Sequence, residues 1–555
     1  MSSAETIKPA ETDQSAPISI VMVQDVFQVG DIKNNADKII EASIKASQQG
    51  ADLVVFPELA LVGYPPEDLL QRQGFLRQTK NECLRIQHSL KECIGDTGVV
   101  FGLPYEHAGE LYNAALYLSH GVIRKFCFKQ SLPNYSVFDE KRYFSAGQES
   151  SIIDVKGHKI GLLICEDVWQ TDCVKQSKNN GAQAIVVLNA SPFHINKHAE
   201  RIDILQKHAK QFDIPIMYLN MTGGQDELVF DGDSLAVNRQ AELVARASLF
   251  EDDKIEIIFD GYDITSQHMV DSEASSEAVT YKALLTGVRE FVHQNGFTGV
   301  VIGLSGGVDS ALTLAIACDA LGAENVEAVM MPSRYTADIS LQDAAAEAEL
   351  LGVKYDVVAI EDVFNSFINT LAPVFDGASV DTTEENIQAR CRGLLLMAIS
   401  NKQGRMVLTT GNKSEMAVGY ATLYGDMCGG FAPIKDVCKT LVYKLCRYRN
   451  SVSAVIPERV LTRPPTAELR EDQCDQDSLP DYDVLDRILE LSVEQDKPID
   501  EIVAEGIDRE TVLQVITMVQ RNEYKRRQSA PGIRITRRAF GRDRRYPITS
   551  GYRRK

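Results

Sequence analysis

The sequence lacks several features that would place the protein in a special class. No apolar run approaches the length of a transmembrane helix, and the polar first residues contain no signal-peptide core. The 11 cysteines include no C-x-x-C pair, which disfavours a zinc site or a disulfide framework and predicts a reducing, cytoplasmic setting. The formal charge of −20 disfavours non-specific binding to nucleic acid. We therefore expect a cytoplasmic protein with neither a membrane nor a nucleic-acid partner.

The chain is long enough for several domains, and its pattern changes near the middle. It has 555 residues, of which 44% are apolar and 25% charged, as in ordinary globular proteins. Residues 1–17 are polar and predict a disordered tail. Residues 18–262 contain many short apolar strands with helical patterns between several of them, which predicts two sheets packed face to face with helices outside.

The second half follows a different pattern. Residues 263–278 are rich in Ser and Glu and predict a linker. Residues 279–555 alternate strands and long helices, which predicts a doubly wound parallel sheet with ligands at the carboxyl ends of its strands. Residues 472–481 resemble a second polar linker, and the chain ends in a basic segment. That segment is interpreted as a solvated tail or a subunit contact, with substrate phosphate as a partner for its first residues.

The segment GLSGGVDS, from Gly303 to Ser310, carries the strongest chemical signal. It joins an apolar strand to an apolar helix, so its glycines allow close backbone approach to an anion at a helix N-terminus. Hydroxyls of Ser305 and Ser310 add donors. The Lys-Ser/Thr pair of a Walker A loop is absent, and Asp309 in its place requires a metal between the carboxylate and the phosphates. The segment predicts a phosphate site.

A second signal lies at the ends of three strands in the first half. KIGLLICEDVW delivers Cys165 at a strand end with acidic residues after it, as a nucleophile elbow does. VVFPEL places Glu58 at another strand end, and Lys129 precedes a proline-bearing loop. A helix N-terminus and a nearby cation lead us to expect a lowered pKa for the Cys165 thiol. Together these residues predict a thiol nucleophile with a base and a cation.

These motifs resemble two known families joined in one chain. The Cys, Glu and Lys pattern resembles the nitrilase superfamily, and SGG-x-DS resembles the PP-loop of ATP pyrophosphatases. FPEL, KQSLPNYSVFDEKRYF, CEDVW, GLSGGVDS and TTGNKSE together resemble the bacterial glutamine-dependent NAD synthetases from residue 18 to residue 555. The resemblance implies an α/β protein with a four-layer αββα glutaminase domain and a Rossmann-like synthetase domain. It also implies that the protein assembles as a homo-oligomer.

For the first domain, the resemblance implies hydrolysis of L-glutamine to glutamate and ammonia. Cys165 would attack the carboxamide, Glu58 would act as general base, and Lys129 would stabilise the oxyanion. Glu140 is a further candidate, either as a general base or as a residue that positions the reacting groups. The residues implied to hold glutamine are Tyr135, Ser191 and Lys197.

For the second domain, the resemblance implies amidation of deamido-NAD to NAD, with ATP split into AMP and pyrophosphate. Mg²⁺ is the implied metal, with Asp309 and Glu415 as its carboxylate ligands. The residues implied to contact ATP are Gly303, Leu304, Ser305, Gly306, Gly307, Val308, Asp309, Ser310, Thr410, Lys439 and Thr466. The residues implied to contact deamido-NAD are Asn386, Glu415, Asp426 and Lys525.

Other functions agree less well with the sequence. Asparagine synthetases use a cysteine directly after the initiator methionine, whereas residue 2 is Ser here. Guanylate synthetases pair their cysteine with histidine, an arrangement not seen around Cys165. A carbon–nitrogen hydrolase fused to a nucleotide sensor stays an alternative, which AMP release would exclude. A non-catalytic scaffold is disfavoured because both sets of polar residues are intact.

Overall fold

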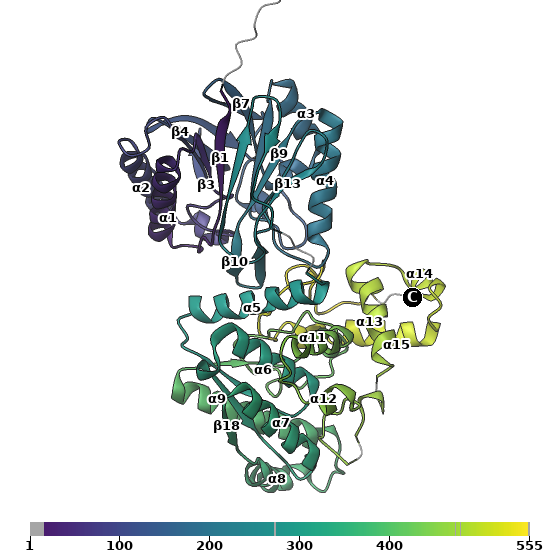
Figure 1. Ribbon diagram of the computed structural model, residues 1–555. Helices are drawn as coiled ribbons and strands as arrows, with labels where there is room; N and C mark the ends of the chain where they lie inside the picture. The colour runs from purple at the N-terminus through teal and green to yellow at the C-terminus, as the bar shows by residue number, and fades with distance from the viewer. Residues whose placement is uncertain (1–15, 271–273, 472, 478, 553–555) are drawn as a thin grey trace, which may run out of the picture.

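The computed structural model describes residues 16–270, 274–471, 473–477 and 479–552 (Figure 1). The predicted N-terminal tail falls almost entirely outside these residues. Among them, no helix combines the length and apolar character needed to cross a membrane. Figure 1 shows the first half of the chain at the top and the second half below it, with α5 (Ser276–Gln294) between them.

The first half forms two mixed sheets. One has the strand order β15-β14-β1-β2-β3-β4-β5 and the other β13-β12-β9-β8-β7-β6, while β10 and β11 form a separate hairpin. The first sheet comprises β1 (Ile18–Gln24), β2 (Leu53–Val55), β3 (Gly98–His107), β4 (Glu110–Ser119), β5 (Val122–Phe128), β14 (Asp253–Phe259) and β15 (Ile264–Thr265). The second comprises β6 (Ser151–Val155), β7 (His158–Ile164), β8 (Ala184–Asn189), β9 (Ile216–Asn220), β12 (Leu235–Val237) and β13 (Leu243–Arg246).

Alternating side chains on these strands build the layers. On β1, Ile20 and Met22 face the other sheet, whereas Val23 packs against the helices on the outer side. On β7, Leu162 joins the core between the sheets and Leu163 the opposite outer layer. The outer layers are α1 (Ile32–Gln48) with α2 (Gln73–Leu90) and α3 (Thr171–Asn179) with α4 (Lys197–Phe212), on opposite sides in Figure 1. This period of two confirms the predicted four-layer αββα sandwich.

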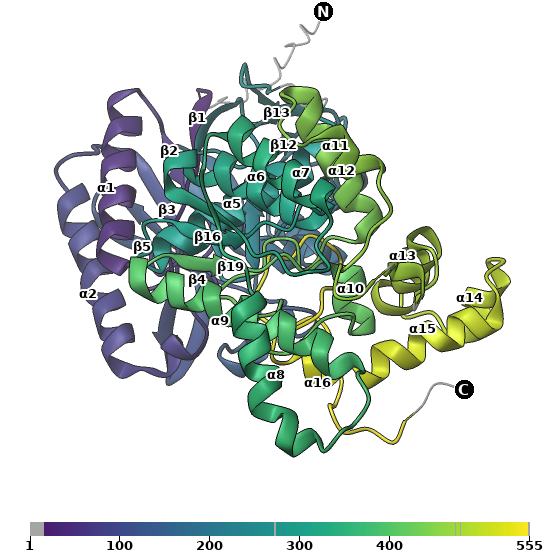
Figure 2. The ribbon, with the colours of Figure 1, turned by 90° about the horizontal axis from the view of Figure 1, so that it is seen from below.

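The second half contains the predicted parallel sheet, in the order β18-β17-β16-β19. Its strands are β16 (Val300–Gly303), β17 (Val326–Met330), β18 (Lys354–Val357) and β19 (Met406–Leu408). Helices cover both faces: Val300 and Ile302 join a core with α5, α6 (Val308–Leu321) and α11 (Lys439–Val452). Val301 joins a core on the other face with α8 (Glu361–Phe375) and α9 (Thr382–Gln403). Figure 2 shows these helices from below.

Regular structure occupies both ends of the predicted linker. β15 pairs with β14 at the edge of the first sheet, and α5 begins at Ser276 with the Ser275 hydroxyl accepting from the amide of Ala278. α5 then packs beside the hairpin of β10 (Thr222–Gln225) and β11 (Leu228–Asp231), where the Gln294 side chain donates to the Gly224 carbonyl at 3.0 Å. The predicted linker over residues 263–278 is therefore shortened at both ends by regular structure.

The basic C-terminal segment is ordered between the two halves. Arg534 and Arg544 are only 7% and 6% exposed, so the solvated-tail interpretation is wrong for both. Arg534 donates to the Phe193 carbonyl in the first half at 3.2 Å, and the Ile195 amide donates to the Ile535 carbonyl at 2.9 Å. Glycine and aromatic residues interrupt this basic run, and the segment folds as an interdomain connection. A separate helical cluster precedes it, made of α13 (Tyr482–Leu489), α14 (Ile499–Ala504) and α15 (Arg509–Arg521) against α10 (Lys413–Val418).

One buried carboxyl group in the second half is poorly accommodated. Glu347 on α7 (Asp338–Leu351) is 0% exposed, and neither of its oxygens has a hydrogen-bond partner among the described residues. Burial, and secondarily the nearby Asp343, raise the pKa of Glu347 well above its ordinary value. The folded protein therefore keeps a proton on Glu347 to higher pH than the unfolded chain does.

Replacing Glu347 by Gln should make stability less dependent on pH. Because the folded pKa is raised, Glu347 favours folding at low pH, and this contribution falls by about 1.4 kcal/mol per pH unit above the unfolded pKa. We expect the parent melting temperature to drop more steeply than that of Glu347→Gln between pH 5.5 and 8, measured by thermal unfolding. Parallel curves for the two proteins would contradict the assignment.

Candidate active sites

The Glu58 carboxylate is delivered by a close crossing of two backbones. Glu58 lies three residues beyond the end of β2, and the chain there passes directly over Gly102 of β3. A Cβ on Gly102 would stand 2.1 Å from the Leu59 amide nitrogen and 2.7 Å from the Glu58 carbonyl carbon. Only glycine permits this approach. The loop places Glu58, 1% exposed, inside the sandwich rather than at its surface.

Lys129 extends from the end of β5 into the same buried space. Its ammonium donates to Oε1 of Glu58 and to Oε1 of Glu140, each at 2.7 Å, and the side chain is completely buried. Burial by itself would lower the pKa of Lys129, but the charges of Glu140 and Glu58 raise it well above the ordinary value. Lys129 is therefore a permanent cation held between two carboxyl groups.

Cys165 occupies the sharp turn that follows β7. Its φ is 46°, a conformation strained for a residue with a side chain, and it opens a short 3₁₀ helix, Cys165–Trp169. The thiol is 5% exposed. The expectation of a lowered thiol pKa is wrong: burial and the Glu58 charge raise it well above the ordinary value, despite the opposing effect of Lys129. The resting thiol is neutral and needs a base at the moment of attack.

Glu140 completes this first centre. Its Oε1 accepts from the Tyr64 hydroxyl at 3.0 Å as well as from Lys129, while Oε2 has no partner among the described residues. Burial raises the pKa of Glu140 to about 7, with Lys129 lowering it and Glu58 raising it. The two carboxyl groups and the ammonium form one coupled cluster, so the proton count of the centre changes near neutral pH.

The three residues expected to hold glutamine lie around this centre but differ in exposure. Ser191 is buried, and Lys197, at the start of α4, has its ammonium 3.9 Å above the centre of the Trp169 ring. Tyr135 is 57% exposed, and its hydroxyl donates to Oε2 of Glu166, the residue after Cys165, at 2.9 Å. The charge of a Cys165 thiolate would raise the pKa of both Tyr135 and Lys197, so the three groups interact electrostatically.

The phosphate-binding segment has the predicted strand–turn–helix form. β16 ends at Gly303 and α6 begins at Val308. Gly306 has a φ of 78°, and a Cβ there would stand 2.4 Å from the Ser340 carbonyl oxygen. The Ser305 amide donates to the Ser310 hydroxyl, and the Gly307 amide to the Ser305 hydroxyl, both at 3.2 Å. The turn is pre-formed by its own hydroxyls, at the N-terminus of a helix.

The two expected metal ligands converge on one cationic group. The Lys439 ammonium donates to Oδ2 of Asp309 at 2.6 Å and to Oε1 of Glu415 at 2.9 Å. Asp309 also accepts from the Asn412 side chain at 2.8 Å. Burial raises the pKa of Glu415 to about 7, opposed by Lys439 and assisted by Asp309. Two carboxylates that surround an ammonium have the charge and hard-oxygen chemistry that a divalent cation requires.

The residues expected to contact the dinucleotide also gather in one place. The Thr422 hydroxyl donates to Oδ1 of Asn386 on α9, and the Thr422 amide donates to Oδ1 of Asp426, both at 2.7 Å. Lys525 donates to the Gly419 and Ala421 carbonyls at 2.8 and 2.9 Å. Burial lowers the pKa of Lys525, and the charge of Asp426 raises it. α9 and the segment after α10 therefore form one polar surface.

Thr410 and Thr466 are related to the phosphate-binding segment through neighbouring residues. Thr410 follows β19, which pairs in parallel with β16, so it lies at the same sheet edge as Gly303. Thr466 lies in a loop in which Arg463 donates to the Gly306 carbonyl at 3.2 Å. The Thr466 hydroxyl itself donates to the Gln473 carbonyl at 2.6 Å.

Comparison with known proteins covers both halves of the chain. Residues 19–266 match the carbon–nitrogen hydrolase family and residues 280–529 match the NAD synthase family. A glutamine-dependent NAD(+) synthetase from Acinetobacter baylyi is 48% identical over 541 residues, covering 96% of this chain and 98% of that protein. One from Thermotoga maritima is 45% identical over 562 residues, covering 95% and 97%. The chain belongs to the glutamine-dependent NAD(+) synthetases.

Solved structures agree with this family. The glutamine-dependent NAD+ synthetase from Acinetobacter baumannii, solved in complex with ADP, is 45% identical with a TM-score of 0.78, covering 97% of this chain and 100% of that one. The synthetase from Cytophaga hutchinsonii, at 23% identity, shares the fold with a TM-score of 0.83 and covers 97% and 98%. The similarity thus spans both domains of the synthetase.

The structure adds Asp167 to the residues that build the glutaminase centre. Asp167 is completely buried, and its Oδ1 accepts from the Gln130 and Ser131 amides at 3.0 and 2.8 Å. Its Oδ2 accepts from the Ile164 amide at 3.1 Å. One carboxylate therefore joins the loop after Lys129 to the turn at Cys165. The sequence signal was present, because Asp167 stands two residues after the cysteine in CEDVW, but nothing in the motif indicated its partners.

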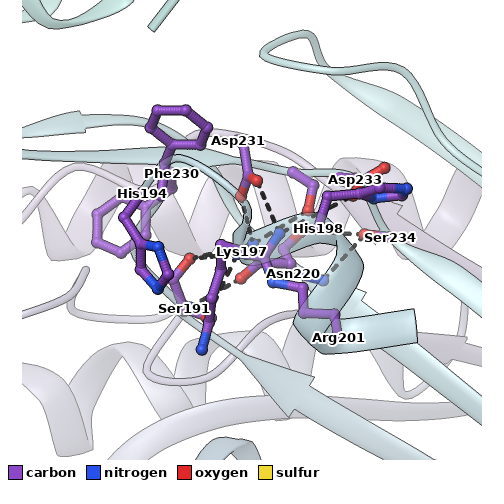
Figure 3. Close-up of polar contacts among 12 residues, drawn as sticks. Ser191, His194, Lys197, His198, Arg201, Asn220, Phe230, Asp231, Asp233 and Ser234 are labelled. Carbon is purple, nitrogen blue, oxygen red and sulfur yellow. Dashed lines mark hydrogen bonds and ion pairs between the residues drawn. The ribbon is translucent and has the colours of Figure 1, made fainter. Parts of the chain in front are cut away.

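A second buried network supports Ser191. Arg201 on α4 is fully buried, and it donates to Asp231 at 2.7 Å and to the Ser191 carbonyl at 3.0 Å (Figure 3). The Asn220 side chain accepts from the Ser191 amide at 2.8 Å. Asp233, beside this group, accepts from Arg246 at 2.8 Å and contacts His198. These residues come from separate elements, so no local motif could have predicted their contact.

Replacing Asp167 by Asn should damage the glutaminase centre selectively. An Asn side chain presents an N–H₂ group to one of the three amides, so the elbow and the Lys129 loop lose their common anchor. We expect glutamine-dependent synthesis to fall by roughly 10²-fold, as for misplaced reacting groups, while synthesis from ammonium salt stays within about twofold. Steady-state assays with each nitrogen source check this, and an equal loss in both would contradict it.

Proposed function

We propose that this protein couples hydrolysis of L-glutamine to the ATP-dependent amidation of deamido-NAD. Membership in the glutamine-dependent NAD(+) synthetases and two separate polar centres in one chain support the proposal. The observation that carries it is the buried group of Glu58, Lys129 and Cys165, joined in the same protein to a pre-formed phosphate turn. We further propose that the chain divides into a glutaminase domain and a synthetase domain near residues 266–275.

In the glutaminase step, the Cys165 sulfur attacks the carboxamide carbon while Glu58 takes the thiol proton. The raised thiol pKa makes this transfer necessary, since little thiolate exists beforehand. Lys129 stabilises the oxygen of the tetrahedral intermediate, and Glu58 returns the proton to the departing nitrogen, so neutral ammonia leaves. Water then attacks the thioester with Glu58 as base and releases glutamate. Tyr135, Ser191 and Lys197 hold the glutamine.

In the synthetase step, the nicotinate carboxylate of deamido-NAD attacks the α-phosphorus of ATP, and pyrophosphate leaves. Ammonia then attacks the adenylated carbonyl carbon, and AMP departs with formation of the amide. The turn from Gly303 to Ser310 holds the phosphates, with Thr410, Lys439 and Thr466 as further ATP contacts. Asn386, Glu415, Asp426 and Lys525 contact the dinucleotide. Ammonia must stay unprotonated, because ammonium has no lone pair, so the nitrogen needs a closed route between the centres.

Magnesium is proposed as the metal of the synthetase centre. Asp309 and Glu415 would hold it, since their oxygens already face one cationic group. Among the described residues, no cluster of three or more acidic, histidine or cysteine side chains is arranged for a metal. Two carboxylates suffice for Mg²⁺, which keeps water and shares phosphate oxygens. When bound, the ion would offset negative charge on the phosphates.

We propose a homo-oligomer in the cytoplasm. Supporting an oligomer, α8 and α9 leave apolar side chains exposed near the dinucleotide residues: Phe367 at 42%, Val374 at 76% and Leu394 at 58%. A second copy of the chain would cover them. All 11 cysteines are free, which supports a reducing compartment. A monomer in sedimentation equilibrium would contradict the oligomer.

Replacing Cys165 by Ala should separate the two activities. Without the sulfur nucleophile, we expect glutamine-dependent NAD formation to fall by roughly 10⁴-fold. Synthesis from ammonium chloride should stay within about twofold, because the phosphate turn and the dinucleotide residues are unchanged. AMP release with deamido-NAD, ATP and each nitrogen source measures both. Loss of both activities in a folded variant would overturn the assignment of two centres.

Replacing Asp309 by Asn should affect both nitrogen sources equally. The change removes a carboxylate charge proposed to face the metal and the phosphates, with nearly the same side-chain volume. We expect NAD synthesis from glutamine and from ammonium to fall on the order of 10²-fold, with a raised Mg²⁺ requirement in an Mg²⁺ titration. Turnover and Mg²⁺ dependence equal to the parent would remove Asp309 from the centre.

A further inference from the structure

Two small cavities are lined in part by residues at or beside the two proposed centres. The first, of about 30 Å³, is lined by Pro65, Val137 and Leu228 from the first domain and by Lys435 and Gly532 from the second, among others. The second, of about 20 Å³, is lined by residues that include Lys435, Glu415 and Asp426. A cavity needs roughly 10–15 Å³ to hold one water molecule. Each space is therefore large enough for a molecule the size of water or ammonia.

Each cavity has lining residues at or beside one of the two centres. Pro65, which lines the first cavity, follows Tyr64, whose hydroxyl donates to Glu140 beside Lys129. Glu415 and Asp426, which line the second cavity, belong to the groups expected to hold the metal and the dinucleotide. The lining residues thus relate the first cavity to the thiol centre and the second to the synthetase centre.

Lys435 is shared by the two cavities. Of the described residues, only Lys435 lines both. The residue is 7% exposed, and its ammonium donates to the Ala530 carbonyl at 2.7 Å, with Oε1 of Glu227 at 3.6 Å. The two partners come from different domains. The position of the side chain therefore depends on one hydrogen bond and one longer ion pair.

The backbone beside Lys435 is held much more firmly than its side chain. The Asp436 carboxylate accepts from the Ile535 and Thr536 amides at 2.9 and 2.7 Å and pairs with Lys413 at 2.9 Å. A Cβ on Gly532 would stand 2.7 Å from the Lys435 Cβ, so this backbone presses against the start of the side chain. Because this backbone is held in place, only the flexible outer part of the Lys435 side chain is free to move.

We propose that Lys435 is the gate on the ammonia route: its side chain closes the connection between the two cavities and moves aside to let one neutral molecule through. This inference rests on the proposed function, because it requires glutamine-derived ammonia to travel inside the protein. Lys435 takes no part in bond making at either centre. It is a positioning residue that controls whether released nitrogen reaches the adenylate or is lost to solvent.

The test compares Lys435→Phe with Lys435→Met in the full-length protein. Methionine removes the charge but keeps an unbranched, flexible chain, whereas a phenylalanine ring is wide and stiff in a closely packed site. With amide-labelled glutamine, we expect the NAD formed per glutamate released to fall about fivefold or more in Lys435→Phe, with labelled ammonium appearing in the medium. The ratio in Lys435→Met should stay within about twofold of the parent.

Two further activities distinguish failure of the gate proposal from failure of the proposed function. Glutamate release and ammonium-supported synthesis should both be retained in Lys435→Phe, because neither centre changes. An unchanged ratio in that variant would overturn the gate while leaving the proposed function intact. A parallel loss of all activities with a lowered melting temperature would indicate a structural role and would also overturn it. If Lys435→Phe does not fold, Lys435→Arg, with a wider planar head, must lower the ratio for the proposal to stand.

Discussion

The proposed glutaminase centre depends on one buried ammonium group. Lys129 is completely enclosed and donates to two carboxyl groups at 2.7 Å each, so removing the lysine would leave both carboxyl groups buried without their cation. This arrangement sets the chemistry of the neighbouring thiol. Burial and the charges of Glu58 and Glu140 keep Cys165 protonated, although Lys129 acts in the opposite direction. In the proposed mechanism, the nucleophile is therefore formed by proton transfer during attack rather than stored as thiolate.

The ammonia released at that centre places a requirement on the interface between the two domains. Neutral ammonia is small and readily protonated, and the synthetase centre needs its lone pair. The interface between the domains suits this requirement: Arg534 of the C-terminal segment is buried there and donates to the Phe193 carbonyl, and the Ala530 carbonyl accepts from Lys435. The chain thus uses a basic segment with the composition of a solvated tail as the connection between two catalytic domains.

Local sequence patterns predicted much of this structure, but they could not predict contacts between distant segments. Strand ends in the sequence led to Glu58, Lys129 and Cys165, because a chain must leave a sheet where its apolar run stops. The two facing sheets were predicted from the many short apolar strands of residues 18–262, and alternating residues such as Ile20 and Val23 build their layers. The thiol pKa was predicted wrongly, since a motif does not show how many charges surround a group. Arg201 and Lys435 were missed because their contacts join distant segments that share no motif.

The most direct measurement of the central claim is a nitrogen-transfer assay with amide-labelled glutamine in the presence of excess unlabelled ammonium. If ammonia passes inside the protein, the NAD formed should carry the label from glutamine at nearly the enrichment supplied, because nitrogen released at Cys165 does not mix with the medium. Label diluted to the proportion of the free ammonium would show that the two centres exchange nitrogen through solvent, and it would contradict the account.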